Sequence, residues 1–127
     1  DWLGSELVVN GNFATDSDWT KGANWTINTV ANVATKTSGA ANNIEQAIAI
    51  DVGERYKLNT DFTGITGGNL NIRLGGTTNL DSVSANEVYS EILTAEGVTN
   101  QLRFLGGSTF AGSVGNISCK KILEVAP

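Results

Sequence analysis

Residues 56–62 have the sequence Tyr-Lys-Leu-Asn-Thr-Asp-Phe, and residues 70–74 have the sequence Leu-Asn-Ile-Arg-Leu. In both stretches, large or β-branched side chains alternate with polar ones, which is the pattern of a β-strand with one buried face and one solvated face. The hydrophobic residues of an amphipathic helix would instead recur every three or four positions. The two stretches therefore predict strands of an antiparallel sheet.

Similar runs recur along the chain. The run 44–50 has some helical propensity, but it is short and places Ile44, Ile48 and Ile50 at strand spacing. In the run 88–94 both alternations contain hydrophobic residues, so its inward phase stays open. The segment 6–13 predicts a short strand that runs into Asn10-Gly11, a strong turn signal. Including the two runs above, further strands are predicted over residues 24–30, 33–37, 44–50, 88–94, 101–105 and 114–123.

Composition and strand count together predict one all-β domain over residues 1–127. Fifteen glycines, with abundant Asn and Thr, suit many turns between short strands. Roughly eight to ten strands without a convincing helix indicate an antiparallel jelly-roll β-sandwich, and its first and last strands should lie near one another. The residues expected in the core are Phe13, Tyr56, Leu58, Phe62, Ile72, Leu74, Phe104 and Ile117.

The sequence contains no histidine, which excludes Ser-His-Asp catalysis, Cys-His catalysis and the usual zinc sites. The single cysteine, Cys119, lies among strand-forming residues and is expected to be a buried structural residue. Thirteen acidic residues remain, but no pair of them stands out as the two carboxyl groups of a glycosidase. We therefore expect a binding protein and not an enzyme.

The formal net charge of −5 argues against non-specific nucleic-acid binding, which relies on Lys and Arg to neutralise phosphates. The eight basic residues are scattered, and Lys120-Lys121 is the only adjacent pair. No hydrophobic run approaches the roughly 20 residues that cross a bilayer, so we expect no membrane span.

Six polar residues alternate with hydrophobic residues on predicted strands that could share one sheet. Amide, carboxylate and guanidinium groups on such a face suit the vicinal hydroxyls of a sugar, and an aromatic ring can stack on the apolar side of a pyranose. A merely solvated sheet face is the alternative interpretation. The candidate carbohydrate-binding residues are Asn59, Asp61, Asn71, Arg73, Gln101 and Arg103, with Trp19 and Tyr89 as candidate stacking rings.

The first residues form a short hydrophobic segment for which no strand partner is predicted. Two large hydrophobic side chains, Trp2 and Leu3, precede the flexible Gly4. Such side chains gain little from exposure to solvent and can fill a pocket in another subunit. We interpret residues 1–5 as a candidate docking arm, with a disordered end as the alternative.

Several short motifs follow one another in the order of a known family. They are the run Leu7-Val-Val-Asn-Gly-Asn-Phe13, then Trp19, Trp25 and Gln46, the run Gly53-Glu-Arg-Tyr56, and the closing run Phe110-Ala-Gly-Ser-Val-Gly-Asn-Ile-Ser118. Together they resemble the carbohydrate-binding-module-like jelly rolls, which belong with the galactose-binding-like domains. Residues 10–27, with the sequence NGNFATDSDWTKGANWTI, also look like runs in tailed-bacteriophage virion proteins.

In such virion proteins these modules decorate capsids or form parts of tail fibres and spikes. The resemblance therefore implies a structural protein located in the virion. Its partners would be other capsid or tail subunits, or further copies of itself, and host-surface glycans would be additional ligands. The alternative is a carbohydrate-binding module, either stand-alone or appended to a larger protein.

The resemblance also bears on calcium. The last strand of the family often carries Asp-Asn, and that Asp can help to hold a structural calcium ion near the opening loop. This chain has Gly115-Asn116 at that place, and a glycine offers calcium only its carbonyl oxygen. Asn12, Asp16 and Asp18 could supply oxygen ligands, but a polar turn without an ion is favoured, and no cofactor is expected.

Overall fold

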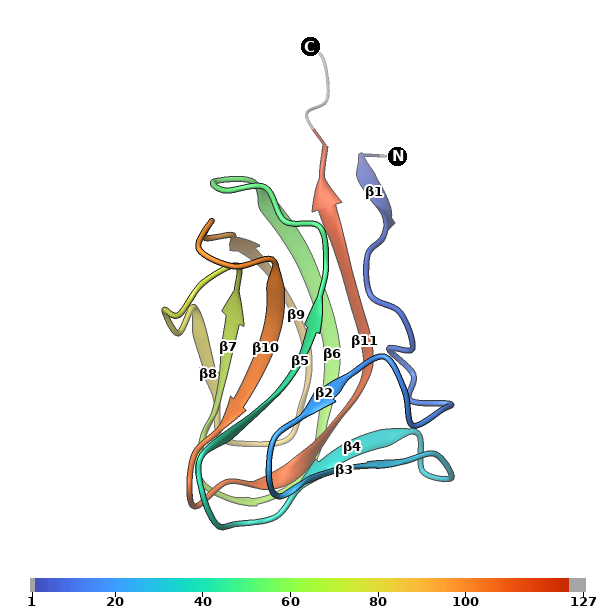
Figure 1. Cartoon of the computed structure of the whole chain (residues 1–127), viewed down its shortest axis with the longest axis vertical. Coiled ribbons are helices and arrows are strands. Elements are labelled where there is room, and N and C mark those ends of the chain that lie inside the picture. The colour runs from blue at the N-terminus through green and yellow to red at the C-terminus, as the bar shows by residue number, and fades with distance from the viewer. Residues whose placement is uncertain (1, 124–127) are drawn as a thin grey trace.

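Figure 1 shows the computed structural model, which describes residues 2–123. These residues form two packed β-sheets. One sheet has six strands in the order β3-β4-β11-β6-β9, and β1 pairs with β11 as well. Both β1 and β4 lie along the edge of β11 that faces away from β6. The strands of this sheet are β1 (Leu3–Glu6), β3 (Trp25–Asn28), β4 (Val33–Lys36), β6 (Arg55–Gly67), β9 (Glu87–Thr94) and β11 (Ala111–Ile122).

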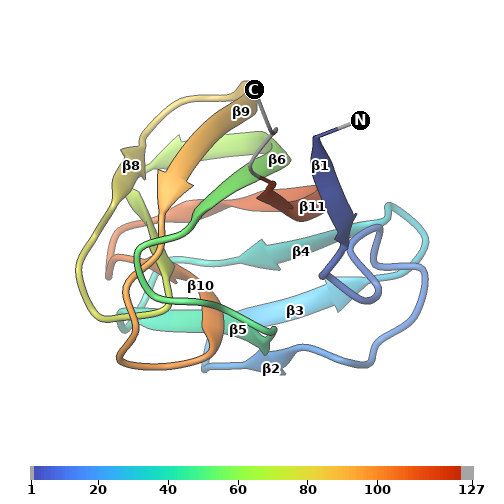
Figure 2. The ribbon, with the colours of Figure 1, turned by 90° about the horizontal axis from the view of Figure 1, so that it is seen from above.

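The second sheet has five strands in the order β2-β5-β10-β7-β8. From β4 onward almost every connection crosses from one sheet to the other, and Figure 2 shows the two layers from above. The predicted antiparallel β-sandwich is confirmed, with eleven strands in the described part of the chain. Among residues 2–123 no helix is long and hydrophobic enough to cross a membrane. The strands of this sheet are β2 (Thr20–Lys21), β5 (Asn42–Ala47), β7 (Leu70–Leu74), β8 (Asp81–Val83) and β10 (Gln101–Gly106).

The core lies between the two sheets, and most of it is built by alternating residues of the strands. All eight predicted core residues are buried, none with an exposed fraction above 5%. Phe62 of one sheet packs edge-on against Phe104 of the other, with ring centroids 6.3 Å apart. Cys119 is also buried, and this burial raises the pKa of its thiol to about 12, so the nucleophilic thiolate is not formed at neutral pH.

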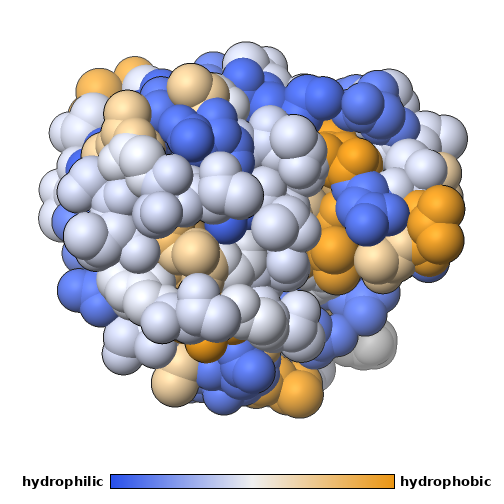
Figure 3. Space-filling view, turned by 90° about the horizontal axis from the view of Figure 1, so that it is seen from below, coloured by the Kyte–Doolittle hydropathy of each residue, from blue (hydrophilic) through white to orange (hydrophobic). Residues whose placement is uncertain are grey.

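The inward phase of β9, which the sequence leaves open, is now defined. Tyr89 and Leu93 are buried, whereas Val88 is 84% exposed and Ile92 is 43% exposed. Figure 3 shows the lower end of the molecule as mostly intermediate in hydropathy, with scattered hydrophilic groups and a cluster of hydrophobic side chains on the side where β3 and β4 lie. Val30, in the turn between those two strands, is 92% exposed. Exposed hydrophobic residues are thus found on an edge strand and at a loop tip.

The N-terminal segment is paired, contrary to the expectation of an arm without a strand partner. Leu3 lies opposite Ile122 of β11, and the carbonyl oxygen of Trp2 accepts a hydrogen bond from Leu123 N at 2.8 Å. The sequence did not indicate this because four residues are too few to show an alternation. The first and last strands lie side by side, as predicted (Figure 1). Docking through Trp2 and Leu3 stays a prediction, and Asp1 lies outside the described residues.

The segment after β1 is a loop over residues 7–19, so the short strand predicted to run from Glu6 into the Asn-Gly turn is wrong beyond its first residue. The Asn-Gly turn itself is present, closed by a hydrogen bond from Phe13 N to Asn10 O at 3.2 Å. Asn10 has φ 55° and Phe13 has φ 50°. A residue in this left-handed region interrupts an extended strand, so the segment around Asn10 and Phe13 forms a loop.

This opening loop joins the edges of the two sheets. Gln46 of β5 donates a hydrogen bond to Val9 O and accepts one from Val9 N, both at 2.8 Å. On the other sheet, Ile117 N of β11 donates to Gly11 O at 2.9 Å. A Cβ at position 11 would lie 2.0 Å from the Ile117 carbonyl oxygen, so this close approach requires glycine. The loop therefore closes one side of the sandwich.

Lys36 of β4 is buried, with an exposed fraction of 1%. Its Nζ donates to the carbonyl oxygens of Thr37, Gly107 and Phe110 at 3.0, 3.1 and 3.4 Å. Three carbonyl oxygens match the three donors of an ammonium group. Burial lowers the pKa of Lys36, because it disfavours the charged form. The side chain ties β4 to the loop that precedes β11.

Replacing Phe104 by alanine should lower the free energy of unfolding by roughly 3 to 5 kcal/mol, because the lost ring leaves a cavity between the sheets. Urea denaturation followed by tryptophan fluorescence measures this change. A loss below about 1 kcal/mol would show that the inward phase assigned to β10 is wrong.

Replacing Lys36 by methionine should destabilise the protein by roughly 1 to 3 kcal/mol, because three carbonyl oxygens lose their donor while the volume stays similar. Urea denaturation checks this, with Lys21→Met on the surface as the matched control. A Lys36→Met protein as stable as the wild type would mean that the cost of burying the ammonium group outweighs its hydrogen bonds.

Candidate functional site

The six polar candidate residues do not share one sheet, so the interpretation of a single hydrogen-bonding face is wrong. All six alternate with buried residues and therefore point outward, but they do so from opposite sides of the sandwich. Four belong to β7 and β10 of the five-stranded sheet, and two belong to β6 of the six-stranded sheet. The first group is Asn71, Arg73, Gln101 and Arg103, and the second is Asn59 and Asp61.

The turn between β6 and β7 separates the two groups. Gly68 in this turn has φ +75°, and a Cβ there would lie 2.3 Å from the backbone nitrogen of Phe110. A glycine therefore lets the chain turn tightly against the neighbouring backbone. At this point the chain leaves the six-stranded sheet and enters the other one, which the alternation within each strand cannot reveal.

The outer face of the five-stranded sheet brings four of the predicted residues together with Glu45 of β5, and we call these five residues the polar face. Arg103 lies opposite both Glu45 and Arg73 in the strand register. Its Nε is 3.3 Å from Glu45 Oε1 and donates to Gln101 Oε1 at 2.9 Å. The side chains of Arg103 and Glu45 are each only 19% exposed. Their neighbours therefore hold them in place.

Arg73 is anchored in the same way, because its Nε donates to Asn79 Oδ1 at 2.7 Å. Both arginines thus use Nε for internal contacts, and their terminal guanidinium nitrogens have no hydrogen-bond partner among the described residues. Asn71, next to Arg73 on β7, adds an amide to the same face. The polar face therefore presents oriented donors and acceptors toward solvent, an arrangement suited to a polyhydroxylated or anionic ligand.

Two residues of this arrangement were missed in the sequence. Glu45 lies between the buried residues Ile44 and Gln46, and the alternation used for other strands would have placed it on the outer face. Asn79 lies in the loop between β7 and β8. Its contact with Arg73 depends on the path of that loop, for which the local sequence carries no signal.

The two candidate stacking rings are buried, so their interpretation as sugar-stacking residues is wrong. Trp19 is 6% exposed, donates from Nε1 to Asn10 O at 3.0 Å, and packs against Phe13 with ring centroids 5.4 Å apart. Tyr89 is 3% exposed and donates from its hydroxyl to Asp81 Oδ2 at 2.7 Å. Burial, together with this hydrogen bond, raises the pKa of Tyr89. Both rings occupy inward positions and complete the core.

The three candidate metal ligands take part in local contacts of the opening loop. Among residues 2–123 no group of three or more His, Cys, Asp or Glu side chains is placed to hold a metal ion. The carboxylate and amide oxygens instead stabilise turns and one ion pair. Asp16 Oδ1 pairs with Lys21 Nζ at 2.7 Å, Asn12 Oδ1 accepts from Ala14 N at 3.2 Å, and Asp18 Oδ2 accepts from Ser17 Oγ at 2.9 Å.

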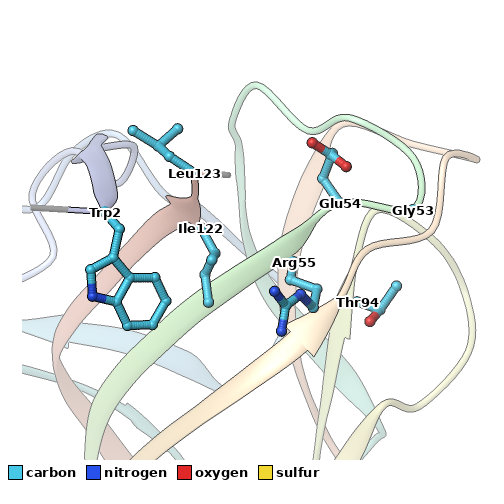
Figure 4. A pocket seen from close by; sticks show the side chains of 7 residues that line it. All are labelled: Trp2, Gly53, Glu54, Arg55, Thr94, Ile122 and Leu123. Atoms are coloured by element: carbon cyan, nitrogen blue, oxygen red, sulfur yellow. The ribbon is translucent and has the colours of Figure 1, made fainter. Parts of the chain in front are cut away.

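A pocket of about 320 Å³ lies at the end of the sandwich where β1 and β11 pair. Trp2, which is 50% exposed, forms one of its walls. Figure 4 shows the side chains of Trp2, Ile122 and Arg55 extending in the same direction, while Glu54 points the opposite way. The residues that line the pocket are Trp2, Gly53, Glu54, Arg55, Thr94, Ile122 and Leu123.

No protein-family model matches this chain, and no curated protein matches it in sequence. Two solved structures are similar to it. The enzymatically active domain of tailspike protein 4 of bacteriophage CBA120 matches 92% of this chain with a TM-score of 0.59 and 20% sequence identity, and the chain spans 21% of that tailspike structure. The CBM1 carbohydrate-binding module of BiXyn10A, in its apo form, matches 98% of this chain and is itself covered over its full length, with a TM-score of 0.62 and 16% identity. The chain thus shares its β-sandwich fold with both structures.

Adding the chelator EGTA should change the melting temperature by less than about 2 °C, because a ligand stabilises a fold only if it is bound to it. We predict this from the local contacts of Asn12, Asp16 and Asp18. Differential scanning calorimetry with and without added calcium makes the measurement. A fall in the melting temperature of more than a few degrees would indicate that these three residues do bind calcium.

Proposed function

We propose that this chain is a non-catalytic carbohydrate-binding module of a phage tail-associated protein, and that it holds a glycan on the polar face. The observation that carries the proposal is the pair of arginines, Arg73 and Arg103. Each is anchored at Nε by a neighbouring side chain, and each keeps its terminal nitrogens without a partner among the described residues. Donors fixed in this way lose little conformational freedom when a ligand binds.

The chemistry of the polar face fits sugar hydroxyls. Glu45 and Gln101 supply acceptors beside the guanidinium donors of Arg103, and Asn71 supplies an amide that can both donate and accept. A pair of vicinal hydroxyls needs donors and acceptors side by side, which a face of one charge sign would not provide. Because Trp19 and Tyr89 are buried, binding here would depend on hydrogen bonds and not on stacking, and we expect modest affinity.

The absence of catalysis is part of the proposal. The chain has no histidine, and its one thiol, that of Cys119, is buried with a raised pKa. On the polar face the carboxylate of Glu45 is paired with Arg103, which favours a binding role over proton transfer.

The virion setting is supported by the likeness to a tailspike domain together with the resemblance of residues 10–27 to virion proteins. In this setting other tail or capsid subunits would be the protein partners and host-surface glycans the ligands. Mass spectrometry of purified particles that contain the chain would identify those subunits. Recovery of the protein only outside particles would contradict the setting but not the glycan-binding role.

A glycan array followed by calorimetric titration tests the binding role. We expect Arg73→Gln to weaken binding of the best array ligand roughly tenfold or more, the effect of losing a hydrogen bond from a charged group. The matched control is Asn59→Ala, because Asn59 faces outward from the opposite sheet. That variant should bind as well as the wild type.

Two results would overturn this proposal. One is an array on which no glycan binds above background. The other is equal binding by the wild type and Arg73→Gln, with circular dichroism showing that both are folded.

A further inference from the structure

The outer face of the six-stranded sheet carries three cations beside the pocket at the chain ends. Arg55 and Lys57 alternate with buried residues of β6 and so point outward, about 7 Å apart along the strand. Lys120 follows the buried Cys119 on β11 and points to the same side. We call Arg55, Lys57 and Lys120 the basic face.

The strand register brings two of these cations into direct opposition. Lys57 of β6 lies opposite Lys120 of β11, a placement in which like charges destabilise an antiparallel sheet. Among residues 2–123 neither ammonium group has an ion pair or side-chain hydrogen bond, and the guanidinium of Arg55 also has none. In a chain with a net charge of −5, three clustered cations without an ion-pair partner among the described residues favour a site for an anion.

Two acidic residues, Glu6 and Glu54, lie next to the basic face, and both carboxylates have other partners. Glu6 lies opposite Lys120 in the register of β1 and β11. Its carboxylate accepts hydrogen bonds from three backbone N–H groups and from Ser118 Oγ, and it forms no ion pair with Lys120. Glu54 pairs with Lys121 at 3.4 Å. On the other side, the β9 residues opposite Lys57 and Arg55 are the uncharged Ile92 and Thr94. Neither Glu6 nor Glu54 forms an ion pair with a cation of the basic face.

Trp2 and Ile122 add a flat hydrophobic surface next to Arg55. Trp2 is 50% exposed, whereas Ile122 is only 7% exposed, so Ile122 forms a floor beside the accessible indole. Figure 4 shows the side chains of Trp2, Ile122 and Arg55 in a row along one side of the pocket. An indole of this exposure is suited to the apolar side of a pyranose ring. The pocket of about 320 Å³ is in the size range of small-ligand sites.

We propose that Trp2 and the basic face form a second binding site, specific for a sugar chain that carries carboxylate groups. The pyranose ring of one unit stacks on Trp2, and its carboxylate is bound by the planar fork of Arg55. Lys57 and Lys120 bind the carboxylate of a neighbouring unit, which removes their mutual repulsion. This site goes beyond the proposed function, because it uses no residue of the polar face and lies on the other sheet.

The combination of groups favours an acidic sugar over other ligands. A neutral glycan would leave Lys57 and Lys120 uncompensated. An acidic peptide would compensate them, but it has no rigid apolar ring face to cover the indole of Trp2. The planar guanidinium of Arg55 matches the planar carboxylate, with two parallel hydrogen bonds.

Calorimetric titration of the full chain with an oligogalacturonide, a hyaluronan oligosaccharide and an oligosialic acid tests the site. We expect at least one of them to bind with an affinity that falls as salt rises, and its methyl-esterified form not to bind. Trp2→Ala, Arg55→Gln and Lys57→Gln should each weaken binding roughly tenfold or more. The matched control is Lys21→Gln, which removes an equal charge far from this face in the strand order and should leave binding unchanged.

A second measurement does not depend on the ligand. Lys57→Gln should raise the melting temperature of the free protein at low salt, because it removes one of two opposed like charges, and the gain should shrink at high salt.

The site is disproved if none of the three acidic oligosaccharides binds, or if the Arg55 and Lys57 variants bind unchanged. If polyglutamate binds as tightly as the best oligosaccharide, the ligand of this site is an acidic protein segment and not a sugar. The two binding sites can be tested separately. A glycan that the array identifies as a ligand of the polar face should not compete with the acidic oligosaccharide, so the failure of one site can be told from the failure of the other.

Discussion

The pairing of β11 with its neighbours is the interaction on which the rest of the structure depends. This strand lies between β6 on one side and both β4 and β1 on the other, so it joins the first and last parts of the described chain. Near its middle the register with β6 shifts between Gly115 and Ser118. At this irregularity Thr60 Oγ1 donates to Gly115 O at 2.9 Å, and Ile117 N is free to bind the opening loop at Gly11. The loop in turn places Phe13 and Trp19 in the core.

A consequence of the crossings between the sheets is that the two outer faces differ in chemistry. Strands that are neighbours in sequence, such as β6 and β7, present their polar residues on opposite sides of the molecule. The five-stranded sheet carries paired charges, as in Arg103 with Glu45. On the six-stranded sheet Lys57 lies opposite Lys120, and neither ammonium group has an ion pair among the described residues. A single small sandwich can in this way offer one surface for sugar hydroxyls and another for sugar carboxylates.

The fold class and the core could be predicted because alternation is a local property. Tyr56, Leu58 and Phe62 are buried wherever their strand lies, since period-two alternation alone puts them on one face. The sheet to which a strand belongs is not a local property, so alternation alone does not reveal that Asn59 and Asn71 face opposite sides of the molecule. The burial of Trp19 depends on the path of the opening loop around Asn10, and the pairing of β1 depends on a partner more than a hundred residues away. Neither leaves a signal in the neighbouring sequence.

The central claim is that a glycan binds on the polar face, and NMR tests it most directly. Backbone amide shifts of the isotope-labelled wild-type protein are followed during titration with a glycan that binds it. The account predicts that the largest changes fall on β5, β7 and β10, around Arg73 and Arg103, with a second group around Arg55 and Lys57 only when the glycan is acidic. Changes spread over the loops, or confined to β6 and β9 for a neutral glycan, would contradict it.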